Sequence, residues 1–371
     1  MSSAVILHPL YSDVGGAEKV ALEVARALVK EGWHVRWLTP RPVPKISERL
    51  KLLGGLPSSV KMVYVDTPFI SKVLPGKRLH ALSLYRHLLS LVHEYGNLVI
   101  DTKSDMPIPV DIVYIHYPMI LGWKKRNPLY ERLVTWMYQR IRGEPRLLLT
   151  NSRWTADIIS RTYGMNAHVL YPPVDTDIFG KALNINSTRE RIVVTASRLD
   201  PAKRLERLVD VAIRLPNYTF VIIGLTTQRS RQALELIEQR KRKLRADNVE
   251  VRMDFSHYDL MKLYATARFY LHPEFPEPFG IAVVEAMAAG LVPIVYRDGG
   301  AWTDIVSQLD ERLGYTRIVE AANIIREIEK REEWSRLSMR AHQYSSQFST
   351  SLFHKRFLSY FHQLLKQLKL G

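Results

Sequence analysis

Two basic residues stand where they could hold a diphosphate. Arg198 lies in Thr195-Ala-Ser-Arg198-Leu-Asp, and Lys203 follows just before a helical pattern that begins at Arg204. Because an apolar run precedes them, both side chains are expected at the carboxyl edge of a strand, facing a cleft. Two fixed cations in that place would bind a diphosphate and neutralise a departing phosphate. The alternative is a surface loop whose charges are solvated.

Two glutamates flank the start of another predicted helix. In Glu277-Pro-Phe-Gly280-Ile-Ala-Val-Val-Glu285, Glu277 lies on the loop and Glu285 in the first helical turns. The amides of Phe279 and Gly280 would form an anion cradle at the helix tip, where Ile281 is also expected to meet the substrate. Carboxylates at this spacing suit the hydroxyls of a ribose or a sugar better than a metal ion. A capped helix with an exposed acidic residue is the alternative.

A glycine pair forms a third candidate site. Gly15 and Gly16 follow the first predicted strand and open a helix, in the stretch Gly15-Gly-Ala-Glu18. Gly16 allows the backbone to approach a ligand closely, and the helix N-terminus offers amides to an anion. A tight strand–helix turn without a ligand would explain the same residues.

The elements that must position these residues alternate through the first half of the chain. Short apolar runs are typical of strands buried on both faces of a parallel sheet, and amphipathic patterns such as Glu18–Lys30 lie between them. The predicted strands are Val5–Pro9, Val35–Thr39, Val60–Val65, Leu98–Ile100, Val110–His116, Leu147–Asn151 and His168–Tyr171.

The alternation restarts after a proline-containing break at Tyr171–Phe179. The predicted strands there are Ile192–Ala196, Phe220–Ile223, Val249–Met253, Phe269–His272 and Val292–Tyr296. The predicted helices are Arg204–Leu215, Arg229–Leu244, Asp259–Ala267 and Gly280–Ala289. The sequence therefore predicts an α/β protein with two doubly wound, Rossmann-like domains, residues 1–175 and 176–345, facing each other across a cleft. An apolar stripe predicts a last helix within 346–371 that packs back on the first domain.

Composition narrows the classes of function. The chain has 371 residues and no cysteine, and 53 Lys and Arg against 37 Asp and Glu give a net charge of +16. Such a surplus indicates an anionic partner. Since no basic block is longer than Arg240-Lys-Arg-Lys243 and no stacking-aromatic pattern occurs, we expect no nucleic-acid partner. No clustered pair of aspartates is present to hold a metal, so we expect no metal cofactor.

The segment Pro68–Tyr95 mixes apolar residues with Lys72, Lys77, Arg78 and Arg86. This pattern fits a helix lying on an anionic membrane, and it fits equally a core-facing helix with a solvated basic face. No apolar run reaches the roughly 18 residues of a membrane span, and the N-terminus does not resemble a signal peptide. We therefore expect a cytoplasmic protein, peripherally attached to the inner face of the membrane.

These motifs together resemble the retaining family 4 glycosyltransferases of the GT-B fold, whose E-x7-E motif matches Glu277 and Glu285. Within them the chain is similar to the asparagine-linked-glycosylation α-1,2-mannosyltransferases that use GDP-mannose. That similarity lies in Ile115-His116-Tyr-Pro118, Asn151-Ser-Arg-Trp154-Thr, Tyr171-Pro-Pro-Val-Asp175 and the stretch from His272 to Glu285.

The resemblance implies roles for individual residues. Those implied in catalysis are His116, Glu277, Arg198 and Lys203. Those implied in substrate binding are Gly15, Gly16, Arg198, Lys203, Phe279, Gly280, Ile281 and Glu285. In this assignment the two cations bind the donor diphosphate, Glu277 the donor sugar and Glu285 the ribose. His116 would lie near the transferred sugar and the attacking hydroxyl.

The resemblance also implies a reaction. The first domain would bind the acceptor and the second the nucleotide sugar. Mannose would pass with retention from GDP-mannose to a polyprenyl- or dolichyl-diphosphate-linked glycan, without a metal, at the cytoplasmic face of an anionic membrane. The alternative is a soluble family 4 enzyme that uses a UDP- or ADP-sugar and a soluble acceptor.

Overall fold

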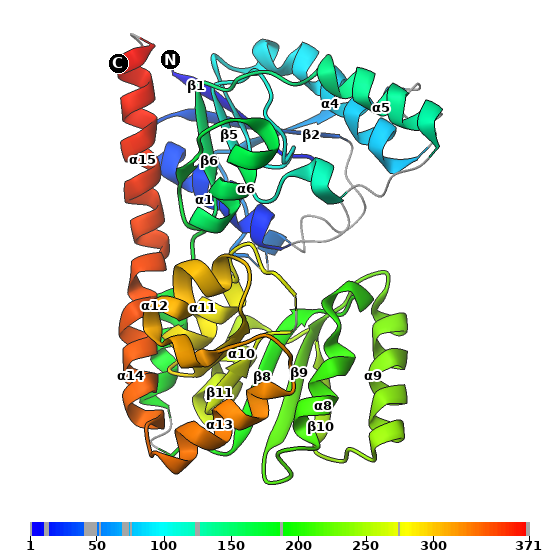
Figure 1. Cartoon of the computed structure of the whole chain (residues 1–371). Helices are drawn as coiled ribbons and strands as arrows, with labels where there is room; N and C mark the ends of the chain where they lie inside the picture. The colour runs from blue at the N-terminus through cyan, green and yellow to red at the C-terminus, as the bar shows by residue number, and fades with distance from the viewer. Residues whose placement is uncertain are drawn as a thin grey trace. The chain divides into compact units, whose positions relative to one another are not determined.

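The computed structural model describes residues 2–10, 15–40, 50–51, 53–68, 74, 76–122, 127–185, 188–273 and 275–368. The chain divides into two compact units (Figure 1). The first joins Met1–Pro172 to Phe353–Gly371, and the second is Pro173–Leu352. Each unit carries its own parallel sheet.

Over the described residues, the first unit contains a seven-stranded sheet in the order β3-β2-β1-β4-β5-β6-β7. The strands are β1 (Ser3–Leu7), β2 (His34–Pro40), β3 (Lys61–Val65), β4 (Leu98–Asp101), β5 (Ile112–Ile115), β6 (Leu147–Thr150) and β7 (His168–Val169). The strand order reverses at β1, which pairs in parallel with both β2 and β4. Open α/β sheets bind ligands at the carboxyl ends of the strands at such a switch point.

Helices cover both faces of this sheet because its strands are apolar on both sides. Helix α1 (Gly16–Lys30) shares one core with Ala4 and Ile6 of β1. Helices α4 (Lys77–Tyr95) and α5 (Pro128–Gln139) share the other core with Val5. The described residues of this unit also form η1 (Met119–Gly122) and α6 (Arg153–Tyr163).

Helix α15 (Thr350–Gln367) completes the core of the first unit. Its Phe353, Phe357 and Phe361 recur every fourth residue, are buried, and stack with centroid distances of 6.3 and 5.9 Å. They share the core of α1 and β1, beside which α15 runs in Figure 1. His354 Nε2 also lies 2.9 Å from Glu23 Oε2 of α1. The end of the chain thus stabilises its beginning.

In the described part of the second unit, six parallel strands are ordered β10-β9-β8-β11-β12-β13. They are β8 (Ile192–Arg198), β9 (Thr219–Leu225), β10 (Val249–Met253), β11 (Phe269–Leu271), β12 (Val292–Tyr296) and β13 (Gly314–Tyr315). The order reverses between β8 and β11, so a ligand is expected at the carboxyl ends of this pair.

The helical segments of the second unit are α7 (Thr176–Gly180), η2 (Lys181–Asn184), η3 (Pro201–Lys203), η4 (Leu205–Leu208), α8 (Val209–Ala212), α9 (Ser230–Leu244), α10 (His257–Thr266), α11 (Ile281–Ala288), η5 (Ala301–Val306), α12 (Ser307–Leu309), η6 (Glu311–Leu313), α13 (Glu320–Lys330), α14 (Trp334–Ser345) and η7 (Ser346–Phe348).

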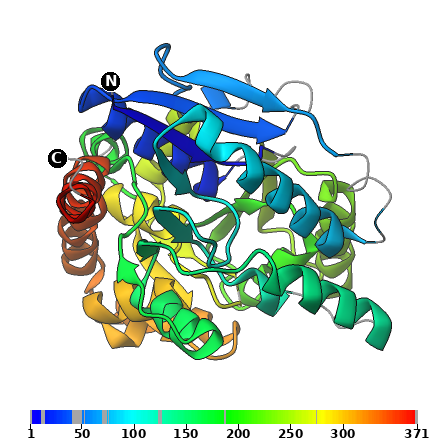
Figure 2. The ribbon, with the colours of Figure 1, turned by 90° about the horizontal axis from the view of Figure 1, so that it is seen from above.

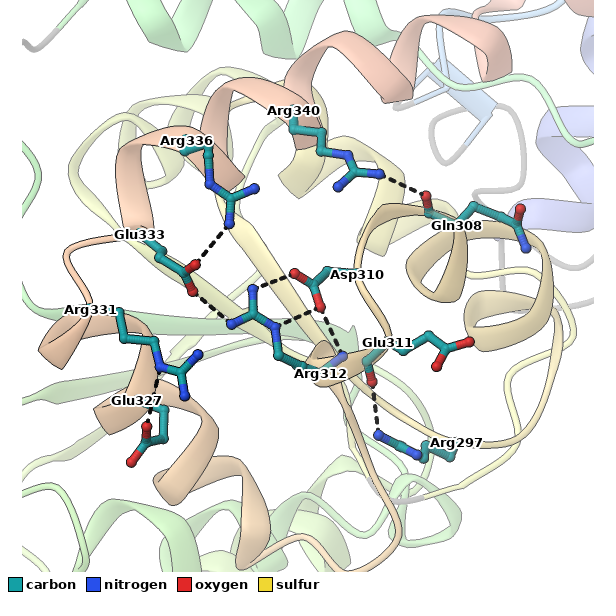
Figure 3. Close-up of polar contacts among 10 residues, drawn as sticks. All are labelled: Arg297, Gln308, Asp310, Glu311, Arg312, Glu327, Arg331, Glu333, Arg336 and Arg340. Carbon is teal, nitrogen blue, oxygen red and sulfur yellow. Dashed lines mark hydrogen bonds and ion pairs between the residues drawn. The ribbon is translucent and has the colours of Figure 1, made fainter.

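Many arginines of this unit hold its helices together (Figure 3). Arg312 on η6 pairs with Asp310 at 2.7 Å and with Glu333 at 2.8 Å, and Arg336 of α14 lies 3.0 Å from the same Glu333. Nearby, Arg297 donates to the Glu311 carbonyl oxygen at 2.8 Å. Part of the chain's positive charge is therefore neutralised inside the fold rather than offered to a ligand.

The predicted pair of doubly wound α/β folds is confirmed, and several elements differ in detail from the prediction. The strand β13 was not predicted, because it has only two residues and follows no apolar run. The predicted start of a helix at Arg204 is wrong, because Arg204 has a left-handed φ of 52° and lies outside any helix. This residue separates the short helix η3, which ends at Lys203, from the short helix η4, which begins at Leu205.

Helix α4 has the burial pattern that the core-facing interpretation of Pro68–Tyr95 predicts for the described residues 77–95. Its apolar residues Leu79, Leu82, Leu88 and Val92 are buried against the sheet, and Lys77 and Arg86 are exposed. Residues 77–95 therefore form a core-facing helix with a solvated basic face. Lys72 lies outside the described residues.

Candidate active site

Lys203 and Glu277 meet at the β8–β11 switch point. Lys203 ends η3, shortly after β8, and Glu277 follows β11 on the loop that leads to α11. The Lys203 Nζ atom lies 3.1 Å from Glu277 Oε2, and both side chains are only partly exposed. The fold therefore brings together two of the residues that the sequence singles out.

His272 and Phe275 complete this group, and sequence reasoning did not select either as a site residue. His272 Nε2 lies 3.5 Å from Glu277 Oε2, and its Nδ1 donates to the Pro273 carbonyl oxygen at 2.9 Å. The Lys203 ammonium lies 4.0 Å from the centre of the Phe275 ring. The sequence feature that could have identified His272 is its position directly after a strand, at the edge of the sheet.

The surrounding charges keep Glu277 ionised. Burial alone would raise the pKa of Glu277, but the Lys203 charge and the contact with His272 outweigh it and lower the pKa to about 2. At neutral pH this carboxylate can accept hydrogen bonds and stabilise positive charge, and it holds no proton to donate.

Two glycines shape the backbone around Glu277. Gly299, with a φ of 95°, forms an isolated parallel bridge with Glu277, and the Ala301 amide donates to the Glu277 carbonyl oxygen at 3.2 Å. Gly280, with a φ of 97°, precedes α11, so Ile281 is the first residue of that helix. The Val283 and Val284 amides donate to the Gly280 carbonyl oxygen at 3.0 and 3.2 Å, so the amides of Ile281 and Ala282 are the ones at this helix tip that suit an anion. The Phe279 side chain is buried against Phe348, with 5.4 Å between centroids, so only its backbone is suited to bind a ligand.

Glu285 shares an electrostatic environment with Glu277. Burial raises the pKa of Tyr270 well above its usual value, and the carboxylates of Glu277 and Glu285 raise it further. The Tyr270 hydroxyl donates to the Ala196 carbonyl oxygen of β8 at 3.1 Å. Both glutamates therefore act on one tyrosine at the β8–β11 junction. Arg198 is the last residue of β8 and its side chain is exposed, at the same sheet edge.

In the first unit, His116 follows β5 and is held from two sides. Its amide donates to Asp105 Oδ1 at 2.6 Å, and its Nε2 donates to the Thr102 carbonyl oxygen at 3.1 Å. Burial lowers the pKa of His116, which favours a neutral ring. Since Nε2 carries the proton, Nδ1 is the accepting nitrogen of this ring.

Gly15 and Gly16 adjoin a buried ionic group. The Gly15 amide donates to Glu18 Oε2 at 2.7 Å, so the carboxylate of α1 caps its own helix. Lys103 pairs with Glu18 Oε1, and His8 Nε2 lies 3.4 Å from the same oxygen. Burial would raise the pKa of Glu18, but His8 and Lys103 hold it far below its usual range. Sequence reasoning missed this group because its members are far apart in the chain.

Two other kinds of feature are missing from the part of the chain that the structure describes. Within those residues, no three His, Asp or Glu side chains gather as metal ligands would. Among the same residues, no helix combines the length and apolar character needed to cross a membrane.

The family comparisons agree with this geometry. The family described as "Glycosyltransferase Family 4" matches residues 14–178, and the one described as "Glycosyl transferases group 1" matches residues 178–346. HepE of Anabaena, solved in complex with UDP-glucose, has a TM-score of 0.71 at 18% identity and full coverage of both chains. WaaG, a glycosyltransferase involved in lipopolysaccharide biosynthesis, has a TM-score of 0.70 at 15% identity, over 95% of this chain and 98% of WaaG. The two halves of the chain thus match glycosyltransferase families, and the chain has the GT-B fold of these solved structures.

The chain is also similar to curated proteins that are named as mannosyltransferases. The protein "GDP-Man:Man(3)GlcNAc(2)-PP-Dol alpha-1,2-mannosyltransferase" of Dictyostelium discoideum is 28% identical over 260 residues, covering 64% of this chain and 51% of the relative. The protein of the same name from Mus musculus is 26% identical over 373 residues, covering 81% and 73%. The chain spans about half the length of the first of these relatives.

Proposed function

We propose that the protein is a retaining mannosyltransferase that moves mannose from GDP-mannose to a lipid-diphosphate-linked glycan at the cytoplasmic face of an anionic membrane. The observation that carries the proposal is the 3.1 Å pair of Lys203 and Glu277 at a sheet switch point. The donor and acceptor classes rest on the names of the curated relatives, GDP-Man and a PP-Dol-linked glycan.

In this proposal the second unit holds the donor. The Lys203 ammonium has three protons, so it can keep its contact with Glu277 and still donate to a phosphate oxygen. Arg198 supplies the second cation, and the amides of Phe279, Gly280 and Ile281 supply neutral donors. The ionised Glu277 accepts hydrogen bonds from hydroxyls of the transferred sugar, and Glu285 accepts those of the ribose.

The proposed step follows a front-face route. The bond between the sugar C1 and the diphosphate oxygen breaks, and the bond between C1 and the acceptor hydroxyl oxygen forms on the same face. The hydroxyl proton passes to the departing diphosphate, which leaves as GDP. Lys203 and Arg198 stabilise the negative charge that grows on that leaving group, and they take the place of a metal ion.

The first unit binds the acceptor in this proposal. The neutral His116, fixed through Thr102 and Asp105, would lie beside the transferred sugar and the attacking hydroxyl. Gly15 and Gly16 would border the diphosphate or the acceptor, next to the Glu18 cap of α1.

The test begins with thermal shifts in GDP, UDP, ADP and their sugar conjugates, followed by transfer of radiolabelled mannose into lipid extract. We expect GDP and GDP-mannose to give the largest shifts. We expect Arg198→Ala to reduce transfer about tenfold to a hundredfold, as expected for a lost hydrogen bond to a charged group. Preference for UDP or ADP would support the soluble alternative. Full transfer by Arg198→Ala would contradict its assigned role.

A further inference from the structure

Helix α5 exposes an apolar stripe. The exposed fractions of Leu129, Leu133 and Trp136 are 78%, 38% and 47%, and their spacing of four and three residues puts them on one side of the helix. The buried residues of α5 are Tyr130, Val134 and Met137. Each buried residue follows an exposed one, so the two stripes lie about 100° apart around the axis. One stripe fixes α5 to the core, and the other points outward.

Positive charge accompanies the exposed stripe. Arg132 and Arg140 are exposed, and the Arg140 guanidinium lies 4.3 Å from the centre of the Trp136 ring. Glu131 is the single acidic residue in the sequence of α5, and it pairs with Arg78 of α4. Helices α4 and α5 lie side by side in both ribbon views (Figures 1 and 2), and α4 adds the exposed Lys77 and Arg86.

We infer that the stripe formed by Leu129, Leu133 and Trp136, with Arg132 and Arg140, docks the protein on an anionic lipid membrane. Leucine and tryptophan side chains enter the boundary between headgroups and acyl chains, and arginines beside them bind lipid phosphates. The charge of +16 complements such a surface. A protein partner fits less well, because the arginines interleave with the apolar residues as they do in interfacial helices. This inference rests on the membrane part of the proposed function and locates it on α5, not on α4.

The absence of cysteine from the sequence allows a direct test. Leu133→Cys provides one attachment point for a polarity-sensitive dye. Met339→Cys on α14, where the methionine is 52% exposed beside arginines, is the matched control. With phosphatidylglycerol-containing vesicles we expect a blue shift at position 133 and none at 339, and with phosphatidylcholine vesicles a much smaller shift at 133. No shift at 133, or equal shifts at both positions, would overturn the inference.

Sedimentation with the same vesicles gives the second measurement. Replacing Leu129 and Trp136 by serine should lower the partition coefficient at least about tenfold, because two apolar side chains lose their burial. Changing Arg132 and Arg140 to glutamine should lower it about tenfold and weaken its dependence on salt. Met339→Ser should leave it unchanged. Unchanged partition in both double variants contradicts the docking role.

Two further measurements distinguish membrane docking from donor binding and from dimerisation. All variants should keep the GDP-induced thermal shift of the parent, so vesicle binding is scored independently of transferase activity. A missing GDP shift in the parent would count against the proposed function alone. If the serine variants instead convert a dimer to a monomer in size-exclusion chromatography, with vesicle binding intact, the stripe joins two copies of the chain and the inference is wrong.

Discussion

A β-carbon on Gly299 would lie 2.4 Å from the carbonyl oxygen of Glu277. The two backbones are this close because they form a parallel bridge outside the regular sheet, and Gly299 adopts a φ of 95° there. Glu277 is thereby fixed from the β12 side, and Lys203 and His272 hold its carboxylate from the β8 and β11 sides.

Gly299→Ala should therefore move Glu277 and impair transfer by about a hundredfold, the cost of a displacement near 1 Å at a reacting centre. Gly164→Ala is the matched control, because Gly164 also has a positive φ, of 70°, but no atom within 4 Å of the added carbon. Mannose transfer by the two variants, with circular dichroism to monitor folding, checks this. Equal losses in both would trace the effect to backbone conformation instead.

Lys203→Gln should lower kcat/KM by about a hundredfold to a thousandfold, because a preorganised donor to the leaving group is lost. The change should also raise the pKa of Glu277, which Lys203 now helps to lower to about 2. In the parent, Glu277 should stay ionised throughout the working pH range. In the variant, Glu277 should become protonated at a higher pH than in the parent, so activity should be lost at a higher pH when the medium is acidified.

A pH profile of kcat/KM for the parent and the variant measures both effects. Arg231→Gln, which removes an arginine whose side chain is 92% exposed on α9, is the control and should behave as the parent. An acid limb at the same pH in parent and variant would show that Lys203 does not act on the ionisation of Glu277.

The buried Asp101 predicts an unusual dependence of stability on pH. Burial raises the pKa of Asp101 to about 7, from roughly 3.9 in the unfolded chain. Between these values the unfolded state releases a proton that the folded state retains, so stability falls as the pH rises. From pH 5 to pH 8 we expect a loss of about 3 kcal/mol in the free energy of unfolding.

Asp101→Asn should abolish that loss, since an amide oxygen can still accept the hydrogen bond from the Ser104 amide. Urea unfolding at pH 5 and pH 8 measures the difference. Asp157→Asn removes an exposed carboxylate of α6 and serves as the control. A parental curve that is equally stable at both pH values would refute the role of Asp101.

Phe357→Ala should destabilise the first unit by about 3–5 kcal/mol, as expected for an aromatic side chain removed from a packed core. The change lies in α15, yet the loss should appear in β1 and α1, whose residues share its core. Hydrogen exchange of those elements gives the measurement. Loss of protection confined to α15 would contradict the shared core.

The sequence predicted secondary structure correctly where a run or stripe of one residue type indicates one kind of environment. Continuous apolar runs marked β1 and β8 because parallel strands are buried on both faces, and the phenylalanine stripe marked α15. Lys203 and Glu277 were found because both belong to loops at a predicted strand end.

Contacts between distant residues left no such signal. The bridge of Gly299 to Glu277 and the group of His8, Glu18 and Lys103 depend on how the strands are ordered in space. Helix α5 shows a further limit: its two neighbouring apolar stripes have similar periodicity, and the sequence does not tell which one faces the core.

The position of α15 has a consequence for how the chain is made. The strands β1–β7 leave the ribosome long before Phe353, Phe357 and Phe361 are translated, and the whole second unit is synthesised in between. Until then the apolar surface of α1 and β1 that these rings cover is open to water or to a chaperone. The core of the first unit can therefore be completed only after the second unit has emerged.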